Sequence, residues 1–343
     1  MTRSVIAASE GPRMSGRMLT VVVTVMVTAV AAVAGAVAGL GYASMSARGG
    51  DRNASPRATR IAVARLPARP DSYLGVYMPG VPGSYAPVES FAAVAGRQPD
   101  LALYYSGWHE RFQSAFAAAA SGHGSTPLVQ IDPQRISLAD IAAGLYDTYL
   151  DSYALAVAAY GHPVVIGFGH EMNGDWYDWG YRHVSPALFV LAWRHIHNVF
   201  NARGARNVTW LWTVSVVGGP NVSPLASWWP GKDFVDWVGI DGYYVNPTDT
   251  FSRVFAPTIA QVRQVTPDPV LLAETGAAAG AGKSAKVADL FENIRVRGLL
   301  GFVYFDVNMH GASGYTQNWQ LEDDPAAVDA FRRLAATLHM ASP

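Results

Sequence analysis

The sequence predicts a (β/α)8 barrel, and three observations lead to this fold class. From residue 73 onward, short apolar runs typical of buried strands alternate with stretches typical of helices, and eight such units follow one another. Polar side chains collect directly after the strand-like runs, which is where barrels build their active sites. No glycine fingerprint for a dinucleotide follows the first strand, which argues against the alternative of a doubly wound open sheet.

The eight predicted strands are short apolar runs bounded by glycine, proline or polar residues. They cover residues 73–78, 101–105, 127–131, 164–168, 208–214, 235–240, 270–273 and 300–305. The predicted helices fill most of the joints, at 88–95, 110–120, 138–160, 186–202, 251–265, 284–297 and 325–338. The long joint 215–234 lacks a clear helical pattern and carries Trp228 and Trp229.

Candidate functional residues stand at the ends of these strands. In strand order they are Trp108 and His109, Asp132, His170 and Glu171, Ser215, Asp241 and Tyr243, Glu274, and Asp306 with Asn308. Because a barrel brings all of its strand ends to one rim, we expect these side chains to converge on a single mouth.

The segment 169–180 is the richest of these strand ends. It places an imidazole, a carboxylate, an amide and three large aromatic rings directly after an apolar strand. Aromatic faces stack on sugar rings, and Glu171 with Glu274 forms a carboxylate pair that can hydrolyse a glycoside. A separation of about 5–5.5 Å would permit a covalent glycosyl-enzyme, and about 6.5–9.5 Å would leave room for water. The segment therefore favours carbohydrate chemistry.

Two other chemistries fit the sequence poorly. A zinc site on His170 and Glu171 would need a second histidine at position 174, which is glycine, and His195 and His197 face different directions on a predicted helix. No Gly-x-Ser-x-Gly elbow for a serine nucleophile occurs. We therefore expect neither a metal nor a cofactor.

The amino-acid composition limits the kinds of partner and chemistry that we expect for this protein. Charged residues make up 15% of the chain and the net charge is −1, so no broad electrostatic surface for nucleic acid is predicted. The chain has no cysteine, which excludes disulfides and thiolate chemistry. A neutral polysaccharide is the expected partner.

The pattern of the first 48 residues predicts a targeting segment. Arginines at 3, 13 and 17 precede an uncharged, mostly apolar run at 18–47, as in a signal peptide or an uncleaved signal anchor. We expect residues 1–48 to be this segment, 49–70 a linker and 71–343 a catalytic domain. Either alternative predicts an extracellular or cell-surface protein that contacts the membrane only through this anchor.

A family resemblance follows from two of these motifs. The block from His170 and Glu171 to Trp176, together with Glu274-Thr275-Gly276, resembles glycoside hydrolase family 26. The resemblance covers roughly residues 73–338 and implies a retaining (β/α)8 glycosidase with its acid/base after strand four and its nucleophile on strand seven.

Carried over by position, the resemblance assigns roles to single residues. It implies that Glu171 is the acid/base, Glu274 the nucleophile, and Tyr243 a hydrogen-bond donor to that nucleophile. His170 stands where most related families have asparagine and is expected to contact the sugar or the nucleophile. The expected sugar contacts also include Trp176, Trp319, Trp108 and Asp132. Phe305 and Asp306 stand where many relatives carry a tryptophan, which puts the eighth strand end in doubt.

The resemblance implies an endo-β-glycanase, with β-1,4-mannan as the first substrate and mixed-linkage β-glucan as the second, and the N-terminal segment adds the expectation of export. A carbohydrate-binding protein on a hydrolase scaffold is the alternative. The two glutamates argue against it.

Overall fold

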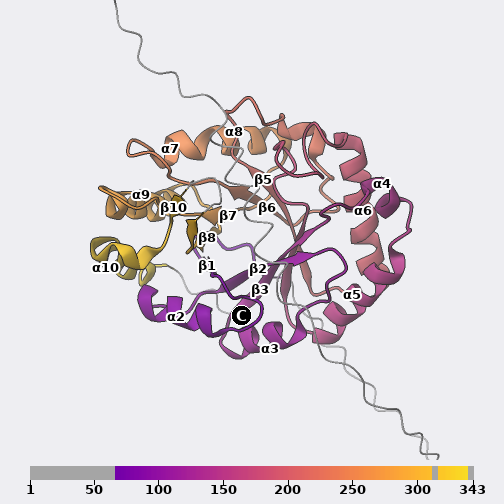
Figure 1. Cartoon of the computed structure of the whole chain (residues 1–343), viewed down its shortest axis with the longest axis horizontal. Coiled ribbons are helices and arrows are strands. Elements are labelled where there is room, and N and C mark those ends of the chain that lie inside the picture. Colours follow the sequence, from indigo (N-terminus) through magenta and orange to yellow (C-terminus); the bar gives the residue numbers. More distant parts are fainter. Residues whose placement is uncertain (1–65, 311–315, 339–343) are drawn as a thin grey trace, which may run out of the picture.

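The computed structural model describes residues 66–310 and 316–338. They confirm the predicted fold: eight parallel strands close on themselves in sequence order, and helices surround them (Figure 1). The strands are β1 (Tyr73–Tyr77), β2 (Leu101–Gly107), β3 (Thr126–Asp132), β4 (Val164–Phe168), β5 (Val208–Ser215), β6 (Trp237–Asp241), β7 (Val270–Thr275) and β8 (Gly301–Phe305). Their ends lie within two residues of the predicted ones.

The helices follow the strands as predicted, with two corrections. They are α2 (Ala86–Ala95), α3 (Ser114–Gly122), α4 (Leu138–Ala142), α5 (Asp147–Tyr160), α6 (Pro186–Ala202), α7 (Phe251–Val254), α8 (Ala256–Val265), α9 (Lys283–Val296) and α10 (Pro325–Ala335), with short 3₁₀ turns η1 (Leu225–Trp228) and η2 (Leu321–Asp323). The single helix predicted at 138–160 was wrong, because Gly144 adopts a φ of 81° and separates α4 from α5. The single helix predicted at 251–265 was also wrong, because Pro257 lies in the first turn of a new helix, where its missing N–H costs nothing.

The barrel interior is filled by side chains and ends in a polar layer below the mouth. Leu103, Val165 and Leu271 belong to one buried interior cluster. Above them the Gln130 amide donates to the Thr213 hydroxyl at 2.9 Å. A Cβ on Gly167 would lie 2.0 Å from Gln130 Oε1, so only glycine leaves room for this side chain.

The first and last elements lie side by side, which closes the ring. β1 pairs in parallel with β8, and α10 lies beside α2 (Figure 1). Arg332 on α10 donates from Nε to Val94 O at 2.7 Å and from Nη2 to Ala93 O at 3.1 Å. These bonds fix the C-terminal helix to the start of the barrel.

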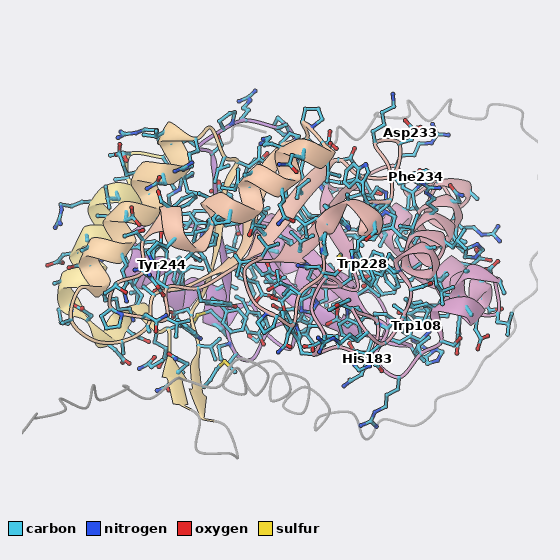
Figure 2. The ribbon with its side chains drawn as sticks, turned by 90° about the horizontal axis from the view of Figure 1, so that it is seen from above. Trp108, His183, Trp228, Asp233, Phe234 and Tyr244 are labelled. Atoms are coloured by element: carbon cyan, nitrogen blue, oxygen red, sulfur yellow. The ribbon has the colours of Figure 1, made fainter. Side chains whose placement is uncertain are left out.

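The mouth carries a hairpin that the sequence analysis did not predict. It consists of β9 (Asn308–His310) and β10 (Thr316–Asn318), which pair antiparallel. Figure 2 shows this hairpin projecting from one end of the barrel, with Trp108 towards the same end and Asp233 and Phe234 at the opposite one.

The predicted targeting segment and most of the predicted linker lie outside the residues that the structure describes. The segment 1–48 and most of the linker 49–70 precede residue 66. Within residues 66–310 and 316–338, no helix combines the length and hydrophobicity needed to cross a membrane.

Candidate active site

The fourth strand delivers His170 and Glu171 to the mouth through a strained backbone. Gly169 and Glu171 both have a φ of 54°, and a residue with a side chain enters this region at a cost of about 1–3 kcal/mol. Hydrogen bonds to both neighbouring strands hold the turn, from Gly169 N to Ile131 O at 2.9 Å and from Glu171 N to Thr213 O at 3.0 Å. His170 and Glu171 are consequently both buried. Strain held in this way is typical of functional positions.

Glu171 has an aromatic hydrogen-bond donor. The indole N–H of Trp176 donates to Glu171 Oε2 at 2.8 Å. The ring lies directly over Gly174, where a Cβ would come within 2.3 Å of it. Gly174, which argued against zinc in the sequence, is therefore required here by the position of Trp176.

Glu274 at the end of β7 accepts hydrogen bonds from two phenols. The Tyr243 hydroxyl donates to Oε2 at 2.5 Å, and the Tyr105 hydroxyl donates to Oε1. The residue is only 3% exposed. Two donors on a buried carboxylate stabilise its ionised form.

Tyr105 was not among the predicted site residues. It lies on β2, where Leu101 and Leu103 face the barrel interior, so its side chain is the next on the inward face. The alternation of side chains along the strand could have identified it. Its partner across the barrel, Glu274, could not be read from β2 alone.

His170 bridges two side chains that the sequence did not connect. It donates from Nδ1 to Asp132 at 2.8 Å and from Nε2 to the Tyr177 hydroxyl at 3.0 Å. Burial lowers the pKa of His170, but the Asp132 carboxylate, and more weakly Glu274 and Glu171, raise it to about 9. The ring is therefore an imidazolium at neutral pH, and Asp132 is the residue that holds it.

The two glutamates hold their protons differently. Burial and then the charge of Glu274 raise the pKa of Glu171 to about 7, against the opposing effects of His170, Trp176 and Ser215. Burial also raises the pKa of Glu274, but the His170 cation and the two phenols oppose it. Glu171 is thus the carboxyl that keeps a proton near neutrality, and Glu274 the one surrounded by donors.

Asp241, at the end of β6, adds a third buried carboxyl. Neither of its oxygens has a hydrogen-bond partner of normal geometry within the described residues. Burial, followed by the charges of Glu274 and Glu171, raises its pKa well above the usual value. Its surroundings therefore favour the protonated form of Asp241 over the carboxylate.

An aromatic cluster lies against Glu274. The ring of Tyr243 is 4.7 Å from that of Trp319 and 5.9 Å from that of Phe305. Phe305 in turn stacks on Tyr77 at 4.7 Å. Trp319, which follows β10, thus lies next to the eighth strand end at which the resemblance was in doubt. Its contact with a sugar stays a prediction.

Other predicted aromatic residues lie further out. Trp108 is half-buried and packs on the rings of Tyr146, Tyr149 and Phe168 at 5.0–6.2 Å. Trp228 is fully buried in the outer core (Figure 2). Neither makes a hydrogen bond or ring contact with Glu171 or Glu274 in the part of the chain that the structure describes.

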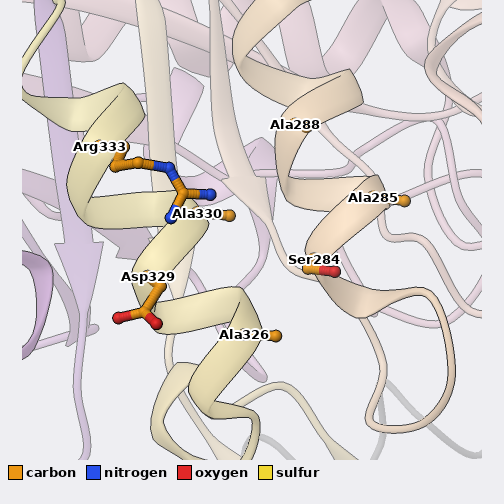
Figure 3. Close-up of a pocket in the computed structure, with 7 residues that line it drawn as sticks. All are labelled: Ser284, Ala285, Ala288, Ala326, Asp329, Ala330 and Arg333. Atoms are coloured by element: carbon orange, nitrogen blue, oxygen red, sulfur yellow. The ribbon is translucent and has the colours of Figure 1, made fainter.

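No candidate metal centre accompanies the carboxyls. Across residues 66–310 and 316–338, no group of three or more histidine, aspartate or glutamate side chains is arranged to hold a metal ion. A groove of about 370 Å³ lies between α9 and α10, lined by Ser284, Ala285, Ala288, Ala326, Asp329, Ala330 and Arg333 (Figure 3). Because it lies on the outer ring and shares no residue with the mouth, it is separate from the carboxyl cluster.

The chain that carries this site is similar in sequence to known glycoside hydrolases. The sequence model described as "Glycosyl hydrolase family 26" matches residues 146–321. Endoglucanase H of Acetivibrio thermocellus is 27% identical over 269 residues, which cover 74% of this chain and 29% of that protein. Mannan endo-1,4-beta-mannosidase A and B of Caldalkalibacillus mannanilyticus is 30% identical over 97 residues, which cover 25% of this chain and 18% of that protein. The chain thus spans less than a third of the length of either relative.

Solved structures resemble the barrel at low sequence identity. A modular endo-beta-1,4-mannanase from Cellulomonas fimi superposes with a TM-score of 0.59 at 18% identity, over 80% of this chain and 76% of that one. The catalytic domain of a Bacillus sp. endo-beta-1,4-mannanase gives a TM-score of 0.57 at 12% identity, over 82% of this chain and 94% of that one. At these identities, the likeness establishes the fold.

Proposed function

Because this chain belongs to glycosyl hydrolase family 26, we propose that it is an endo-acting β-glycanase that works by a retaining double displacement. Its relatives place it among the glycoside hydrolases of β-glycans. The observation that carries the finer proposal is the contrast between two buried carboxyls, one holding a proton and the other held by two phenols. A double displacement needs one protonated carboxyl as the acid and one ionised carboxylate as the nucleophile.

In the first step, Glu171 acts as the acid and Glu274 as the nucleophile. The Glu171 proton passes to the glycosidic oxygen while a Glu274 oxygen bonds to the anomeric carbon and the glycosidic bond breaks. In the second step, water attacks the same carbon, its proton returns to Glu171, and Glu274 leaves as a carboxylate. Atoms and charges balance over the two steps.

The neighbouring residues prepare this pair. The His170 imidazolium, held by Asp132, lies near both carboxylates and favours the ionised form of Glu274. Tyr105 and Tyr243 donate to Glu274, and one of them must release its oxygen when the covalent bond forms. Trp176 donates to Glu171 and offers its partly exposed ring as a sugar platform, while the buried Trp319 packs against Tyr243.

The substrate we propose first is β-1,4-mannan. Sequence similarity to a mannan endo-1,4-beta-mannosidase supports this choice. A β-glucan is the second candidate, because the match to Endoglucanase H extends over most of this chain. Mannose and glucose differ in the orientation of one hydroxyl, so a single hydrogen-bond partner could reverse the preference.

The test is hydrolysis of mannan, mixed-linkage β-glucan and β-1,3-xylan by the full chain. Replacing Glu171 with Gln or Glu274 with Ala should lower the rate by about 10²–10⁴-fold or more. Glu89→Gln, which changes an exposed glutamate on α2, serves as the control for handling and stability. Proton NMR of the first product should show retention at the anomeric carbon, and viscosity should fall faster than reducing ends appear if cleavage is internal.

Each part of the proposal can fail separately. Inversion at the anomeric carbon would reject the double displacement, and full activity in Glu274→Ala would reject the nucleophile. Tight binding of a glycan without turnover by the wild type would favour the carbohydrate-binding alternative.

We also propose that the protein is exported, because arginines precede the apolar run at 18–47. Detection in the culture medium, or digestion by protease added to intact cells, would support export. Recovery of only protected protein in the cytosol would reject it.

A further inference from the structure

A buried ammonium group occupies an unfavourable place outside the carboxyl cluster. Lys283 is the first residue of α9, where the helix dipole repels a cation. It is 0% exposed, and burial lowers its pKa. Within the described residues no carboxylate lies within salt-bridge distance of its ammonium, although the charge of Asp306 partly opposes the lowering of its pKa. Burying a charged group lowers the stability of the fold unless hydrogen bonds or opposite charges compensate for the lost water. The hydrogen bonds of Lys283 are therefore informative about its role.

Those hydrogen bonds all go to one short segment. Lys283 Nζ donates to Trp319 O at 3.4 Å and to Gln320 O. The Tyr304 hydroxyl donates to the same Trp319 carbonyl at 3.0 Å. Asp306 Oδ1 accepts from Leu321 N at 2.7 Å. We call Lys283, Tyr304 and Asp306 the 319–321 clasp, because they hold three consecutive residues.

The clasped segment carries the ring nearest to the Tyr243 side chain. Trp319 is 2% exposed, and its ring lies 4.7 Å from that of Tyr243, whose hydroxyl donates to Glu274 at 2.5 Å. On the other side, the Trp319 side chain meets Gly276, where a Cβ would come within 3.2 Å of it. A shift of Trp319 would therefore be felt by Tyr243 and by the carboxylate it holds.

We propose that Lys283 is a positioning residue for catalysis: by fixing residues 319–321 from the outer ring, it holds Trp319 against Tyr243 and keeps that phenol on Glu274. The proposal rests on the proposed function for its kinetic part. The next lysine on α9 supplies a contrast. Lys286 is also buried, but among the described residues its ammonium makes no hydrogen bond to the segment 319–321.

The experiment combines two readouts on Lys283→Met, which keeps most of the length of the side chain and removes its charge and its hydrogen-bond donors. Hydrogen exchange of the peptide spanning 317–323 should become about tenfold faster, because the amides of this segment lose their support. With the glycan that the wild type cleaves, kcat/KM should fall by about 10- to 100-fold, with kcat contributing, since misplaced groups slow the chemical step. Lys286→Met should change neither.

The outcomes separate this proposal from the proposed function. Wild-type exchange at 317–323, or faster exchange with unchanged kcat and KM, overturns the role of Lys283. If the wild type cleaves no glycan, the proposed function fails, and the exchange readout alone decides whether Lys283 fixes the segment. Should Lys283→Met not fold, Tyr304→Phe removes one donor from the same carbonyl and must change the same two readouts in the same direction.

Discussion

Replacing Trp176 with phenylalanine should move the alkaline limb of activity to higher pH. The indole N–H donates to Glu171 Oε2 at 2.8 Å, which favours the ionised carboxylate and so lowers the pKa of Glu171. Phenylalanine keeps an aromatic ring at this place and removes the donor. The pKa of Glu171, about 7 in the wild type, should therefore rise. Because the acid must be protonated to act, activity should persist to higher pH.

The size of the shift follows from the hydrogen bond. A bond to a charged group contributes about 1.5–3 kcal/mol, and one pKa unit corresponds to about 1.4 kcal/mol, which gives about 1–2 units. Trp176 is partly exposed, so water can replace part of the lost bond. We therefore expect the lower end of this range, an upward shift of about one unit in the alkaline limb. Burial, the largest cause of the raised pKa of Glu171, is expected to remain.

The assay is the pH dependence of kcat/KM, because this parameter reports the groups of the free enzyme. Trp193→Phe is the matched control: its indole N–H donates to Phe234 O at 3.1 Å, in the outer core and away from the carboxyls. The absolute rate of Trp176→Phe should also fall if the indole ring stacks on the sugar, and a change of rate alone therefore does not test the pKa. An alkaline limb at the wild-type position or lower would refute the reasoning.

Two further predictions concern the partners of Glu274 and His170. Tyr105→Phe removes the donor to Oε1, so the pKa of Glu274 should rise and the acidic limb of kcat/KM should move up by about one unit; a limb unchanged from that of Tyr77→Phe, which removes a neighbouring phenol, would contradict this. Asp132→Asn removes the main cause that raises the pKa of His170, so NMR of the imidazole should show a pKa well below about 9. Titration still near 9 would exclude Asp132 as the cause.

The eight strands could be predicted because both of their faces are buried. Runs such as 164–168 and 270–273 are apolar without interruption, as strands between a filled interior and a ring of helices must be. Helix ends were harder. The pattern of apolar residues continues from α4 into α5, and only the left-handed conformation of Gly144 separates them. The β9–β10 hairpin has strands of three residues, too short for alternation to be recognised.

The candidate site could be predicted where polar residues directly follow an apolar strand. Glu171, His170 and Glu274 stood out as polar residues after apolar strands, and the structure brings all three together with Tyr243. Tyr105 was missed because its role depends on the direction of its side chain across a closed barrel. Asp132 was predicted to contact sugar, and the structure places it against His170. Whether it also reaches a sugar stays a prediction.

The cluster of carboxyls explains why the mouth needs so many supporting side chains. Glu171, Glu274 and Asp241 lie close enough for the charge on one to raise the pKa of another, in surroundings that desolvate them all. Charges of the same sign cannot all persist there, so protons are distributed by the donors available. Glu274 has two phenols and a nearby imidazolium, which oppose the effect of burial on its pKa. Asp241 has no donor of normal geometry among the described residues, and its pKa is raised well above the usual value. The order of ionisation is therefore set by neutral and cationic neighbours, and any variant that moves one of those neighbours should change the pH profile before it changes the fold.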